Sequence, residues 1–441
     1  TATPAWAELP APRTSLVGRE EAAATVVAIL HDEATHLLTL TGPGGIGKTR
    51  LSQRAASELE SQFPDGVVFV PLASVENPDL VLPTIAQALG AREEPGQLLL
   101  DRLRVAIGSR RLLLVLDNLE HLRPATPDIG RLLTVAPGLT ILATSRAPLR
   151  LQGERLYPVP PLALPTREPV DPVEISGYAA VELFVQRVRA VRHDFELTAS
   201  NAALVAEICE RLDGLPLAIE LAAARMRVLS LTVLQELLGT RLRLLTGGPM
   251  DAPSRHQSLR AAISSSYDLL DEDEQRLLLR LAIFSGGCTL DAAEAVTGDG
   301  DIFTMLEGLE TLTDEGLLTR TERSNGQVRF GMLESIREFA RHELSGDELA
   351  RMRHRHARYF GELTERAEAE MARAHRAQWM ARLEDEYPNL RAALAWAIES
   401  GESDTAFRLG SALWPFWAAT GRLTEGHTWL QRATDLGGDA D

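Results

Sequence analysis

Lysine is almost absent from this sequence. Arginine supplies nearly all of the 45 positively charged residues, and Lys48 is the single lysine among 441 residues. An arginine- and alanine-rich composition indicates a coding bias against lysine. Lysine is retained only at position 48, where a compact ammonium group would suit the site better than the planar guanidinium of arginine. Lys48 is therefore the first candidate for a functional side chain.

Cysteine and long apolar runs are also scarce. The two cysteines, Cys209 and Cys288, cannot form a disulfide framework, which favours a reducing compartment. No apolar run approaches the ~20 residues that span a bilayer, and the Ala/Pro-rich start of the chain lacks the basic region of a signal peptide. We therefore expect a cytoplasmic protein with no membrane partner.

Positive charge is outnumbered by negative charge. The formal net charge is −17, whereas binding to the phosphate backbone of a nucleic acid requires clustered positive charges. We therefore do not expect this chain to bind nucleic acid non-specifically, and DNA binding is expected only through segments outside it. The sequence begins with Thr1 and stops within an expected helical array, which predicts a fragment of a longer protein.

The length and the hydrophobic pattern predict a multidomain α/β plus α protein. After a linker at 1–13, short apolar runs alternate with amphipathic stretches over 14–162, which is typical of a parallel sheet covered by helices. The expected strands are apolar runs, most of them continuous and suited to burial on both faces, at 36–41, 66–71, 111–117 and 140–144.

Strand signals become rare beyond a group of prolines at 158–165. Helical patterns at 179–192, 199–212 and 217–229 predict a helical domain over 163–250. A Gly/Pro-rich linker follows at 247–253, and then helical patterns at 258–270, 272–284, 290–296 and 303–315. Two strand-like runs, 317–322 and 327–332, flank Ser324-Asn325-Gly326, which is a strong hairpin signal. Helices followed by a hairpin predict a winged-helix domain over 251–340.

The remaining chain, 341–441, is predicted to be helical to its end. The segments 379–400, 404–420 and 423–436 have the pattern of successive antiparallel helices, which predicts the truncated start of a tetratricopeptide-like (TPR-like) repeat array. Aromatic residues are expected on the packing faces of these helices: Trp396, Trp414, Phe416, Trp417 and Trp429.

The segment Gly42-Pro-Gly44-Gly45-Ile46-Gly47-Lys48-Thr49 matches the P-loop pattern G-x-x-x-x-G-K-[ST]. It follows an expected strand and precedes an expected helix at 50–62, the context that the motif requires. Glycines let backbone N–H groups curl round phosphates, and the helix N-terminus adds partial positive charge. Lys48 should reach the β- and γ-phosphates, and Thr49 should bind Mg²⁺. The motif predicts ATP or ADP with Mg²⁺ as cofactors, against the alternative of a glycine-rich turn without a ligand.

Asp117 ends the apolar run 112–117, as the acidic residue of a Walker B element does. At the carboxyl edge of a parallel sheet it would hold Mg²⁺ through water. Asn118 stands where many active ATPases carry a second acidic residue. Glu120 is the nearest other candidate base, and a carboxylate at a helix start is the alternative. We therefore expect slow rather than rapid ATP hydrolysis.

Arg146 follows the apolar run 141–144 and the polar Ser145. On its chemistry alone it is either a sensor that contacts the γ-phosphate through two hydrogen bonds or an ordinary surface arginine. The histidines do not predict a metal site. His354 and His356 are two apart on a helix and therefore lie on different faces. With the isolated His342 and His375, they are expected to be solvated.

Several short segments together resemble the STAND class of signal-transducing P-loop ATPases, which is related to NB-ARC proteins. Within this class the chain is most similar to the ATPase modules of large bacterial transcriptional regulators, among them antibiotic-regulatory proteins, maltose-type activators and LuxR-type regulators. The resemblance extends over most of the chain. Beside the P-loop, the segments that carry it are 15–20, 114–121, 143–146, 214–218, 258–262, 334–340 and 389–394.

This resemblance implies roles for individual residues. Val17 and Arg19 would lie against the adenine side of the nucleotide, and Pro216 would pack near the base or ribose. Arg50 would join the P-loop in nucleotide binding, and Arg146 would be the first sensor arginine. The catalytic set would then be Lys48, Asp117 and Arg146, with Thr49 and Asp117 holding the metal.

One segment departs from the family pattern. NB-ARC relatives carry Met-His-Asp in the winged helix, where the histidine contacts the β-phosphate of ADP. The corresponding residues here are Met332-Leu333-Glu334, and a leucine cannot make that contact. The sequence leaves open whether another residue secures the ADP state or the lock is weaker.

The resemblance implies a nucleotide-operated switch in a transcriptional regulator. ADP would hold a closed monomer, with the winged helix as a lid rather than a DNA reader, and exchange to ATP would allow a homo-oligomer to form. An unidentified ligand or protein would signal at the repeats. Two alternatives stay open: an enzyme that couples hydrolysis to work, and a defence or other STAND protein with a different effector.

Overall fold

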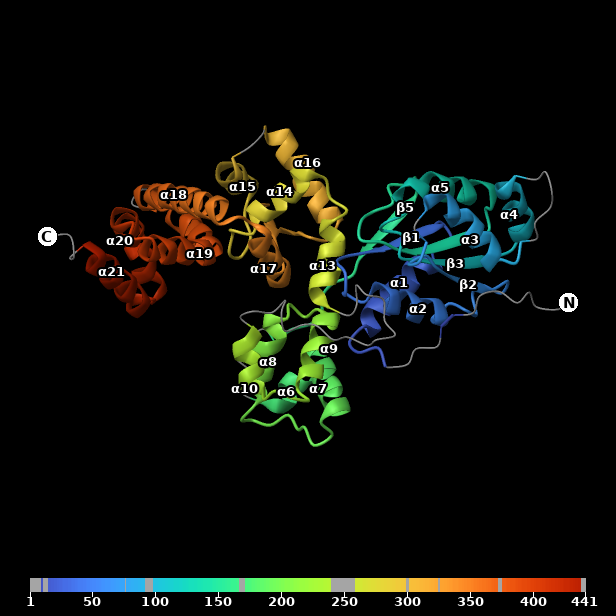
Figure 1. The fold of residues 1–441 in the computed structure, drawn as a ribbon, viewed down its shortest axis with the longest axis horizontal. Coiled ribbons are helices and arrows are strands. Elements are labelled where there is room, and N and C mark those ends of the chain that lie inside the picture. The colour runs from blue at the N-terminus through green and yellow to red at the C-terminus, as the bar shows by residue number, and fades with distance from the viewer. Residues whose placement is uncertain are drawn as a thin grey trace. The chain divides into compact units, whose positions relative to one another are not determined.

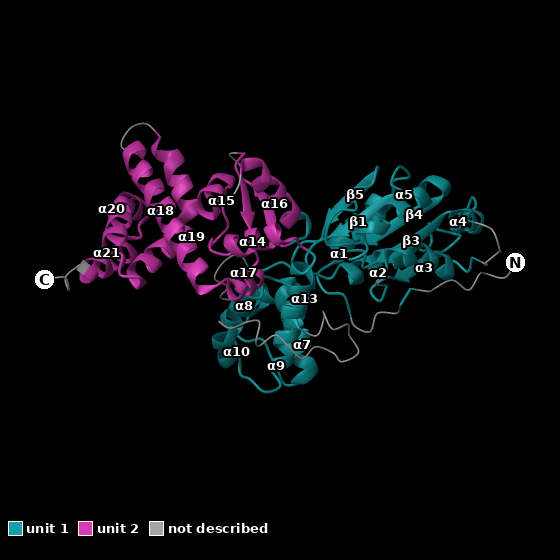
Figure 2. Ribbon diagram, turned by 45° about the horizontal axis from the view of Figure 1, so that its top comes forward, with its two compact units in different colours: residues 1–269, 314–316 teal, residues 270–313, 317–441 magenta. Residues whose placement is uncertain are grey.

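The computed structural model describes residues 9–10, 15–75, 77–91, 98–165, 171–238, 258–298, 301–323, 326–371 and 375–437. The chain divides into two compact units, shown in Figure 2: unit 1 comprises Thr1–Leu269 with Asp314–Gly316, and unit 2 comprises Leu270–Thr313 with Leu317–Asp441. The expected linkers at 1–13 and 247–253 lie outside the described residues, except for Leu9 and Pro10. Among the described helices, none combines the length and the apolarity needed to cross a membrane.

A five-stranded parallel sheet lies at the centre of the α/β part of unit 1 (Figure 1). The strand order is β2-β3-β4-β1-β5. The strands are β1 (Leu37–Thr41), β2 (Val67–Pro71), β3 (Leu112–Asp117), β4 (Leu139–Thr144) and β5 (Glu154–Pro158). Strands β1, β3 and β4 are buried along their whole length, as their apolar runs predict. The edge strand β5 was not predicted, because its residues are mostly exposed and form no apolar run.

Helices cover both faces of this sheet. Buried residues of α3, α4 and α5 form one cluster with alternate residues of β3, namely Leu112, Leu114 and Leu116. Successive side chains of a strand point to opposite faces, so Leu113 faces the other side, and α2 also contacts β3. The helices are α1 (Glu20–His31), α2 (Lys48–Glu58), α3 (Val81–Ala88), α4 (Leu99–Ile107) and α5 (Thr126–Val135), with the short 3-10 turns η1 (Pro78–Leu80) and η2 (Arg123–Ala125).

A helical part completes unit 1. It contains α6 (Pro172–Ser176), α7 (Ala179–Val191), α8 (Ala202–Arg211), α9 (Pro216–Arg225) and α10 (Leu231–Leu237). Helix α13 (Leu259–Tyr267) also groups with unit 1, although its residues were expected to belong to the winged-helix domain over 251–340. Ser258 caps α13 by accepting a hydrogen bond from the N–H of Ala261 at 3.1 Å.

The first part of unit 2 has the element order of a winged helix. Its elements are α14 (Glu272–Leu281), α15 (Leu290–Thr297), α16 (Ile302–Asp314, whose last residue groups with unit 1), β6 (Thr319–Glu322), β7 (Val328–Gly331) and α17 (Glu334–Glu343). Strands β6 and β7 form the expected antiparallel pair. The backbone of Cys288 pairs with that of Phe330 in β7 as an isolated antiparallel β-bridge. Two residues of the expected turn, Ser324 and Asn325, lie outside the described residues.

Four long helices form the rest of unit 2. They are α18 (Gly346–Met371), α19 (Arg376–Glu399), α20 (Ser403–Thr420) and α21 (Leu423–Gly437). Helix α18 contacts α19 and α20, and α20 contacts α21. Phe416 and Trp417 are buried as expected, and the indole N–H of Trp417 donates to the hydroxyl of Tyr387 at 3.0 Å. Trp414 is exposed instead, so the prediction of a packing position was wrong for this residue.

A buried polar network joins the winged helix to the helical array within unit 2. Arg329 of β7 donates two hydrogen bonds to the carboxylate of Glu386 in α19, at 2.5 and 3.1 Å, and both side chains are buried. Asn389, three residues further along α19, donates to the carboxylate of Glu386 at 2.9 Å and to the carbonyl of Gly287 at 2.9 Å. Its own side-chain carbonyl accepts from the N–H of Ser285 at 2.7 Å. One side of the winged helix is thereby fixed to α19.

His356 belongs to the same network, which corrects the expectation of a solvated position. Its side chain is 3% exposed, and Nε2 lies 3.3 Å from the side-chain oxygen of Asn389. The ring also packs against Phe284 and Phe360. Burial lowers the pKa of His356 to about 4, because the charged form would lose its hydration. Helical spacing alone could not reveal that this face of α18 is covered.

The low pKa of His356 predicts a pH-dependent stability. The unfolded chain binds a proton at this residue near pH 6.5, whereas the folded chain does so only near its pKa of about 4. The stabilisation is therefore complete above pH 6.5 and is lost as the pH falls toward 4, by at most about 1.4 kcal/mol per pH unit. In His356→Gln, chemical denaturation between pH 7 and 4 should show a weaker pH dependence than in the parent chain.

A matched control is His354→Gln, because His354 is exposed on the same helix. This variant should keep the pH dependence of the parent chain. An equal pH dependence in the parent and in His356→Gln would contradict the assignment.

Candidate functional site

The P-loop lies between β1 and α2 at the carboxyl edge of the sheet, as the sequence predicted. Gly45 and Gly47 have φ values of 81° and 99°, in the left-handed region that favours glycine. A Cβ atom on Gly45 would also lie 2.8 Å from the Cβ of Leu217, so the α9 region packs directly on this loop. The N–H of Leu217 donates to the carbonyl of Gly45 at 3.2 Å. The loop is thus shaped for phosphate and closed on one side by the start of α9.

Lys48 is the first residue of α2, and its side chain is largely buried within the loop. Its ammonium donates to the carbonyl oxygens of Gly42 at 2.6 Å and Pro43 at 3.2 Å. These contacts place the only lysine of the sequence inside the curl of the P-loop. An ammonium at this place can neutralise the charge of β- and γ-phosphates.

Thr49 and Asp117 lie together. The hydroxyl of Thr49 donates to the Oδ1 atom of Asp117 at 2.7 Å, and the hydroxyl of Thr144 donates to the same atom at 2.7 Å. Burial raises the pKa of the Asp117 carboxyl, and the hydrogen bonds from Thr144 and Thr49 oppose that rise. Thr144 was not predicted as a site residue; its only signal in the sequence is a polar side chain at the end of an apolar strand.

These residues fit a magnesium ion. Mg²⁺ prefers hard oxygen ligands, from the protein and from water. The hydroxyl of Thr49 supplies one such oxygen, and the carboxylate of Asp117, whose Oδ1 atom lies 2.7 Å from it, can hold the ion through water. With Mg²⁺ bound, they would hold the ion, and the ion would neutralise charge on the nucleotide phosphates. Among the described residues, no separate cluster of three or more His, Cys, Asp or Glu forms another candidate metal site.

A cavity of about 310 Å³ opens at the P-loop. Its lining comes from several segments of unit 1 that are distant in sequence: the P-loop and the start of α2, the ends of β3 and β4, the start of α9, and α13. The lining residues are Gly44, Gly45, Gly47, Lys48, Thr49, Arg50, Asn118, Glu120, Thr144, Arg146, Pro216, Leu217, Glu220 and Ala262. A cavity of this size is within the range of small-molecule and cofactor sites.

Arg146 lines this cavity and is not a surface residue, since its side chain is 2% exposed. Its Nε atom lies 3.3 Å from the carboxylate of Glu120. Its Nη1 and Nη2 atoms donate to the hydroxyls of Ser266 at 2.5 Å and Ser265 at 2.6 Å, both in α13. The structure therefore places Glu120 in a turn beside Arg146, not at a helix start. Nothing in the sequence singled out Ser265 or Ser266.

Two residues expected at the adenine side do not line the cavity. Val17 is buried, and Arg19 donates to the carbonyl oxygens of Ile46 at 2.9 Å and Pro160 at 2.6 Å. Burial lowers the pKa of Arg19. Arg19 thus stabilises the P-loop through a hydrogen bond to its backbone.

The side chain of Ile46 is fully buried and belongs to the core. Only the backbone of Ile46 can therefore face a phosphate.

Other predicted residues do reach the cavity. Pro216 lines it at the start of α9, and Arg50 lines it at the start of α2. Arg50 donates to the carbonyl of Ser15 at 2.7 Å and lies 3.8 Å from Glu220. Glu220, which the sequence did not predict as a site residue, lies one turn beyond Pro216 on α9 and also lines the cavity. In unit 2, Leu333 occupies the N-terminal cap of α17.

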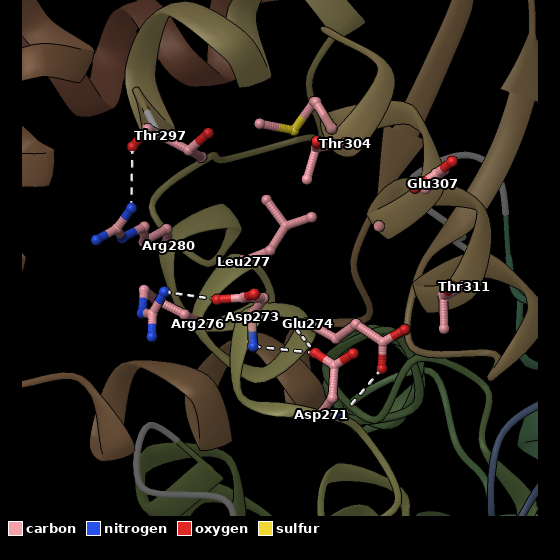
Figure 3. A pocket seen from close by; sticks show the side chains of 12 residues that line it. Asp271, Asp273, Glu274, Arg276, Leu277, Arg280, Thr297, Thr304, Glu307 and Thr311 are labelled. Carbon is pink, nitrogen blue, oxygen red and sulfur yellow. Dashed lines mark hydrogen bonds and ion pairs between the residues drawn. The ribbon is translucent and has the colours of Figure 1, made fainter. Parts of the chain in front are cut away.

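Unit 2 contains a second cavity, of about 480 Å³, between α14, α15 and α16 (Figure 3). Several of its polar side chains are engaged in local contacts. Asp271 and Glu274 form the capping box of α14, Arg276 pairs with Asp273 at 2.8 Å, and Arg280 donates to the carbonyl of Thr297. These contacts stabilise the ends of helices in the winged helix.

Known families match both parts of this arrangement. The family described as "AAA domain" matches residues 31–143, and the family described as "Winged helix-turn-helix domain" matches residues 270–345. The putative HTH-type transcriptional regulator Rv0890c of Mycobacterium tuberculosis is 41% identical over 397 residues, which are 89% of this chain and 43% of that protein. The chain therefore spans less than half the length of this relative.

A second relative is covered over most of its length. The uncharacterized protein Rv0894 of Mycobacterium tuberculosis is 40% identical over 339 residues, which are 75% of this chain and 82% of that protein. Among solved structures, a STAND protein with a tetratricopeptide repeat sensor, PH0952 from Pyrococcus horikoshii, is 16% identical. The match covers 99% of this chain and 66% of the PH0952 chain, with a TM-score of 0.33. No conclusion is based on this similarity.

The fold and the site define an ATPase-like P-loop module joined to a winged helix-turn-helix domain. The chain belongs to the family that includes Rv0894, and over 89% of its length it is similar to the putative HTH-type transcriptional regulator Rv0890c. The predicted similarity to the P-loop modules of bacterial transcriptional regulators is thereby confirmed.

The Thr49–Asp117 pair predicts how nucleotide binding depends on metal. In Thr49→Val, loss of the hydroxyl should reduce the gain in ADP affinity that Mg²⁺ provides by at least about tenfold. Thr49→Ser keeps the hydroxyl and should retain the gain. Titration calorimetry with Mg²⁺ and with EDTA measures both. Unchanged metal dependence in Thr49→Val would rule out this ligand.

Proposed function

We propose that this chain is an ATP/ADP-binding switch module of a transcriptional regulator. The observation that carries this proposal is the composition of the cavity wall. Phosphate-binding residues of the P-loop share one cavity with Pro216 of α9 and Ala262 of α13. A nucleotide in this cavity would contact the α/β part and the helical part at once. Its phosphates could therefore favour one arrangement of these segments over another.

The proposed cycle has two states. With ADP, the cavity stays closed and the protein stays monomeric. With ATP and Mg²⁺, the additional phosphate favours an open form that associates with further copies, and a signal received at the helical array shifts the same equilibrium. The relatives support the regulatory setting, since Rv0890c is named a putative HTH-type transcriptional regulator. Val17 and Arg19 would then act near the adenine end, with Arg19 acting through the backbone of the P-loop.

Slow hydrolysis fits the groups around Asp117. Asn118 is an amide and cannot remove a proton from water as a carboxylate can. The nearest carboxylate along the chain, Glu120, is ion-paired with Arg146 at 3.3 Å and is therefore already engaged with a cation. A switch benefits from this arrangement, because each nucleotide state lasts long enough to be transmitted.

Lys48 provides the direct test of nucleotide binding. Lys48→Ala removes hydrogen bonds to charged phosphates and should weaken ADP and ATP binding by about 10- to 100-fold. Arg54→Ala is the matched control, because Arg54 is a cation on the same helix that pairs only with the surface residue Glu58 in the described contacts. Fluorescence titration with a labelled nucleotide measures both. Equal affinity in Lys48→Ala and in the parent chain would contradict the proposal.

We further propose that the winged helix does not read DNA. In this fold the recognition helix is the second helix of the helix-turn-helix, which here is α16. Helix α16 carries Glu307, Glu310 and Asp314 but no lysine or arginine, and Phe303 on it is 72% exposed. Residues 270–345 contain sixteen acidic and seven basic residues. Such a surface repels a phosphate backbone.

This surface predicts weak DNA binding. At physiological salt, the dissociation constant for duplex DNA measured by fluorescence anisotropy should be no tighter than the ~10⁻⁴–10⁻⁶ M of non-specific binding. The double variant Glu307→Arg/Glu310→Arg changes two exposed residues of α16 and should gain salt-dependent affinity. Sequence-dependent binding of the parent chain well below 10⁻⁶ M would contradict the proposal.

A further inference from the structure

Asn118 lies in the wall of the P-loop cavity, directly after Asp117. Its backbone N–H donates to the hydroxyl of Thr144 at 2.8 Å, and that hydroxyl donates to the Oδ1 atom of Asp117 at 2.7 Å. The φ of Asn118 is 75°, so the chain turns at this residue, directly after the end of β3. The side chain of Asn118 is thus held at a fixed place beside the carboxylate that would hold Mg²⁺.

His121 fixes the direction of the Asn118 amide. The Nε2 atom of His121 lies 2.7 Å from the carbonyl oxygen of Val75, and its Nδ1 atom lies 3.2 Å from Nδ2 of Asn118. A carbonyl oxygen only accepts hydrogen bonds, so Nε2 carries a hydrogen. An amide nitrogen only donates, so Nδ1 is the acceptor and carries none. Both contacts therefore require the same tautomer of His121.

This orientation turns an oxygen atom toward the cavity. Because Nδ2 of Asn118 is directed at His121, the other end of the amide, Oδ1, is left to face the cavity that Asn118 lines. An amide oxygen can accept a hydrogen bond from a water molecule, but it is too weak a base to keep the proton. In other phosphoryl-transfer proteins a glutamine amide orients the attacking water in this way.

We propose that Asn118 orients the water that attacks the γ-phosphate of ATP, and that His121 is the residue that positions its amide. This inference rests on the proposed ATP-binding function and specifies how slow hydrolysis takes place. The water oxygen forms a bond to the γ-phosphorus while the bond from that phosphorus to the β,γ-bridging oxygen breaks. ADP leaves with the electron pair of the broken bond. One proton of the water passes to an oxygen of the released phosphate, since Asn118 cannot keep it.

Replacing the amide by a carboxylate should accelerate hydrolysis. In Asn118→Asp, an oxygen at the place of Oδ1 accepts the same hydrogen bond and can also take the proton, and general-base catalysis contributes ~10²- to 10⁴-fold in rate. The second oxygen can pair with His121 once Nδ1 takes up a proton. Aspartate also tolerates a positive φ, so the turn is kept. The rate constant of Mg²⁺-ATP hydrolysis, measured in single turnovers with radiolabelled ATP, should rise by at least about tenfold.

Removing the amide should have the opposite effect. Asn118→Gly keeps the positive φ, because glycine adopts this conformation without strain. The rate constant should fall by about three- to tenfold, the effect of one hydrogen bond. The dissociation constants of ADP and ATP should not change, because the orienting contact is made to water and not to the nucleotide. Unchanged ADP affinity also shows that the variant has folded.

Substitutions of His121 separate positioning from general structural support. His121→Phe keeps a ring and removes both nitrogens, so it should lower the rate constant by the same factor as Asn118→Gly and leave the KM for ATP unchanged. His121→Asn places a side-chain oxygen where Nδ1 lies and should restore most of the rate. His36→Phe is the matched control, because His36 is an exposed histidine directly before β1, at the opposite edge of the sheet. It should hydrolyse ATP as fast as the parent chain.

A double-mutant cycle tests whether His121 acts through Asn118. In the Asn118→Gly background, His121→Phe should cause no further loss of rate. A loss of the same size as in the parent background would show that His121 acts by another route.

Three results would overturn the inference. Asn118→Asp could fail to accelerate hydrolysis, the effect of His121→Phe could persist in the Asn118→Gly background, or His121→Phe could weaken ATP binding without a change in the rate constant. In each of these cases the parent chain still binds ADP and ATP, so the proposed nucleotide-binding function stands. Failure of the parent chain to bind any nucleotide would overturn the inference and the proposed function together.

Discussion

The carboxylate of Asp117 joins three segments of the candidate site at the P-loop. It ends β3, and it accepts hydrogen bonds from Thr49 at the start of α2 and from Thr144 at the end of β4. Three segments that are far apart in the sequence are thereby fixed at one edge of the sheet. Burial works against its charge, and the two hydroxyls compensate in part. The electrostatics of the site therefore depend on two neutral side chains as much as on the lysine of the P-loop.

The chain beyond Asp117 turns sharply to bring further groups into the cavity. Asn118 has a φ of 75°, a left-handed conformation that asparagine tolerates better than most residues. The side-chain nitrogen Nδ2 of Asn118 lies 3.2 Å from Nδ1 of His121. The Nε2 atom of His121 lies 2.7 Å from the carbonyl oxygen of Val75. This turn places Glu120 beside Arg146. An asparagine at this position thus has a role in local backbone geometry.

The sequence predicted those features that depend on local pattern. Apolar runs, most of them continuous, located four of the five strands, and the spacing of glycines with Lys48 located the P-loop. It did not predict features that depend on which surfaces meet. The serines of α13 are ordinary residues until Arg146, some 120 positions earlier, lies against them. His356 was wrongly expected to be solvated, because its burial depends on Asn389 in the next helix. Edge strand β5 lacks the apolar signal that burial imposes on the other strands.

The scarcity of lysine has a chemical consequence. Because Lys48 is the only lysine of this sequence, every side-chain amine reaction on the chain, whether acetylation, ubiquitination or labelling with an amine-reactive reagent, has a single possible target. That target is largely buried and hydrogen-bonded inside the P-loop. The surface of this module is therefore inert toward lysine chemistry, and a side-chain amine modification that did reach Lys48 would break its hydrogen bonds within the P-loop.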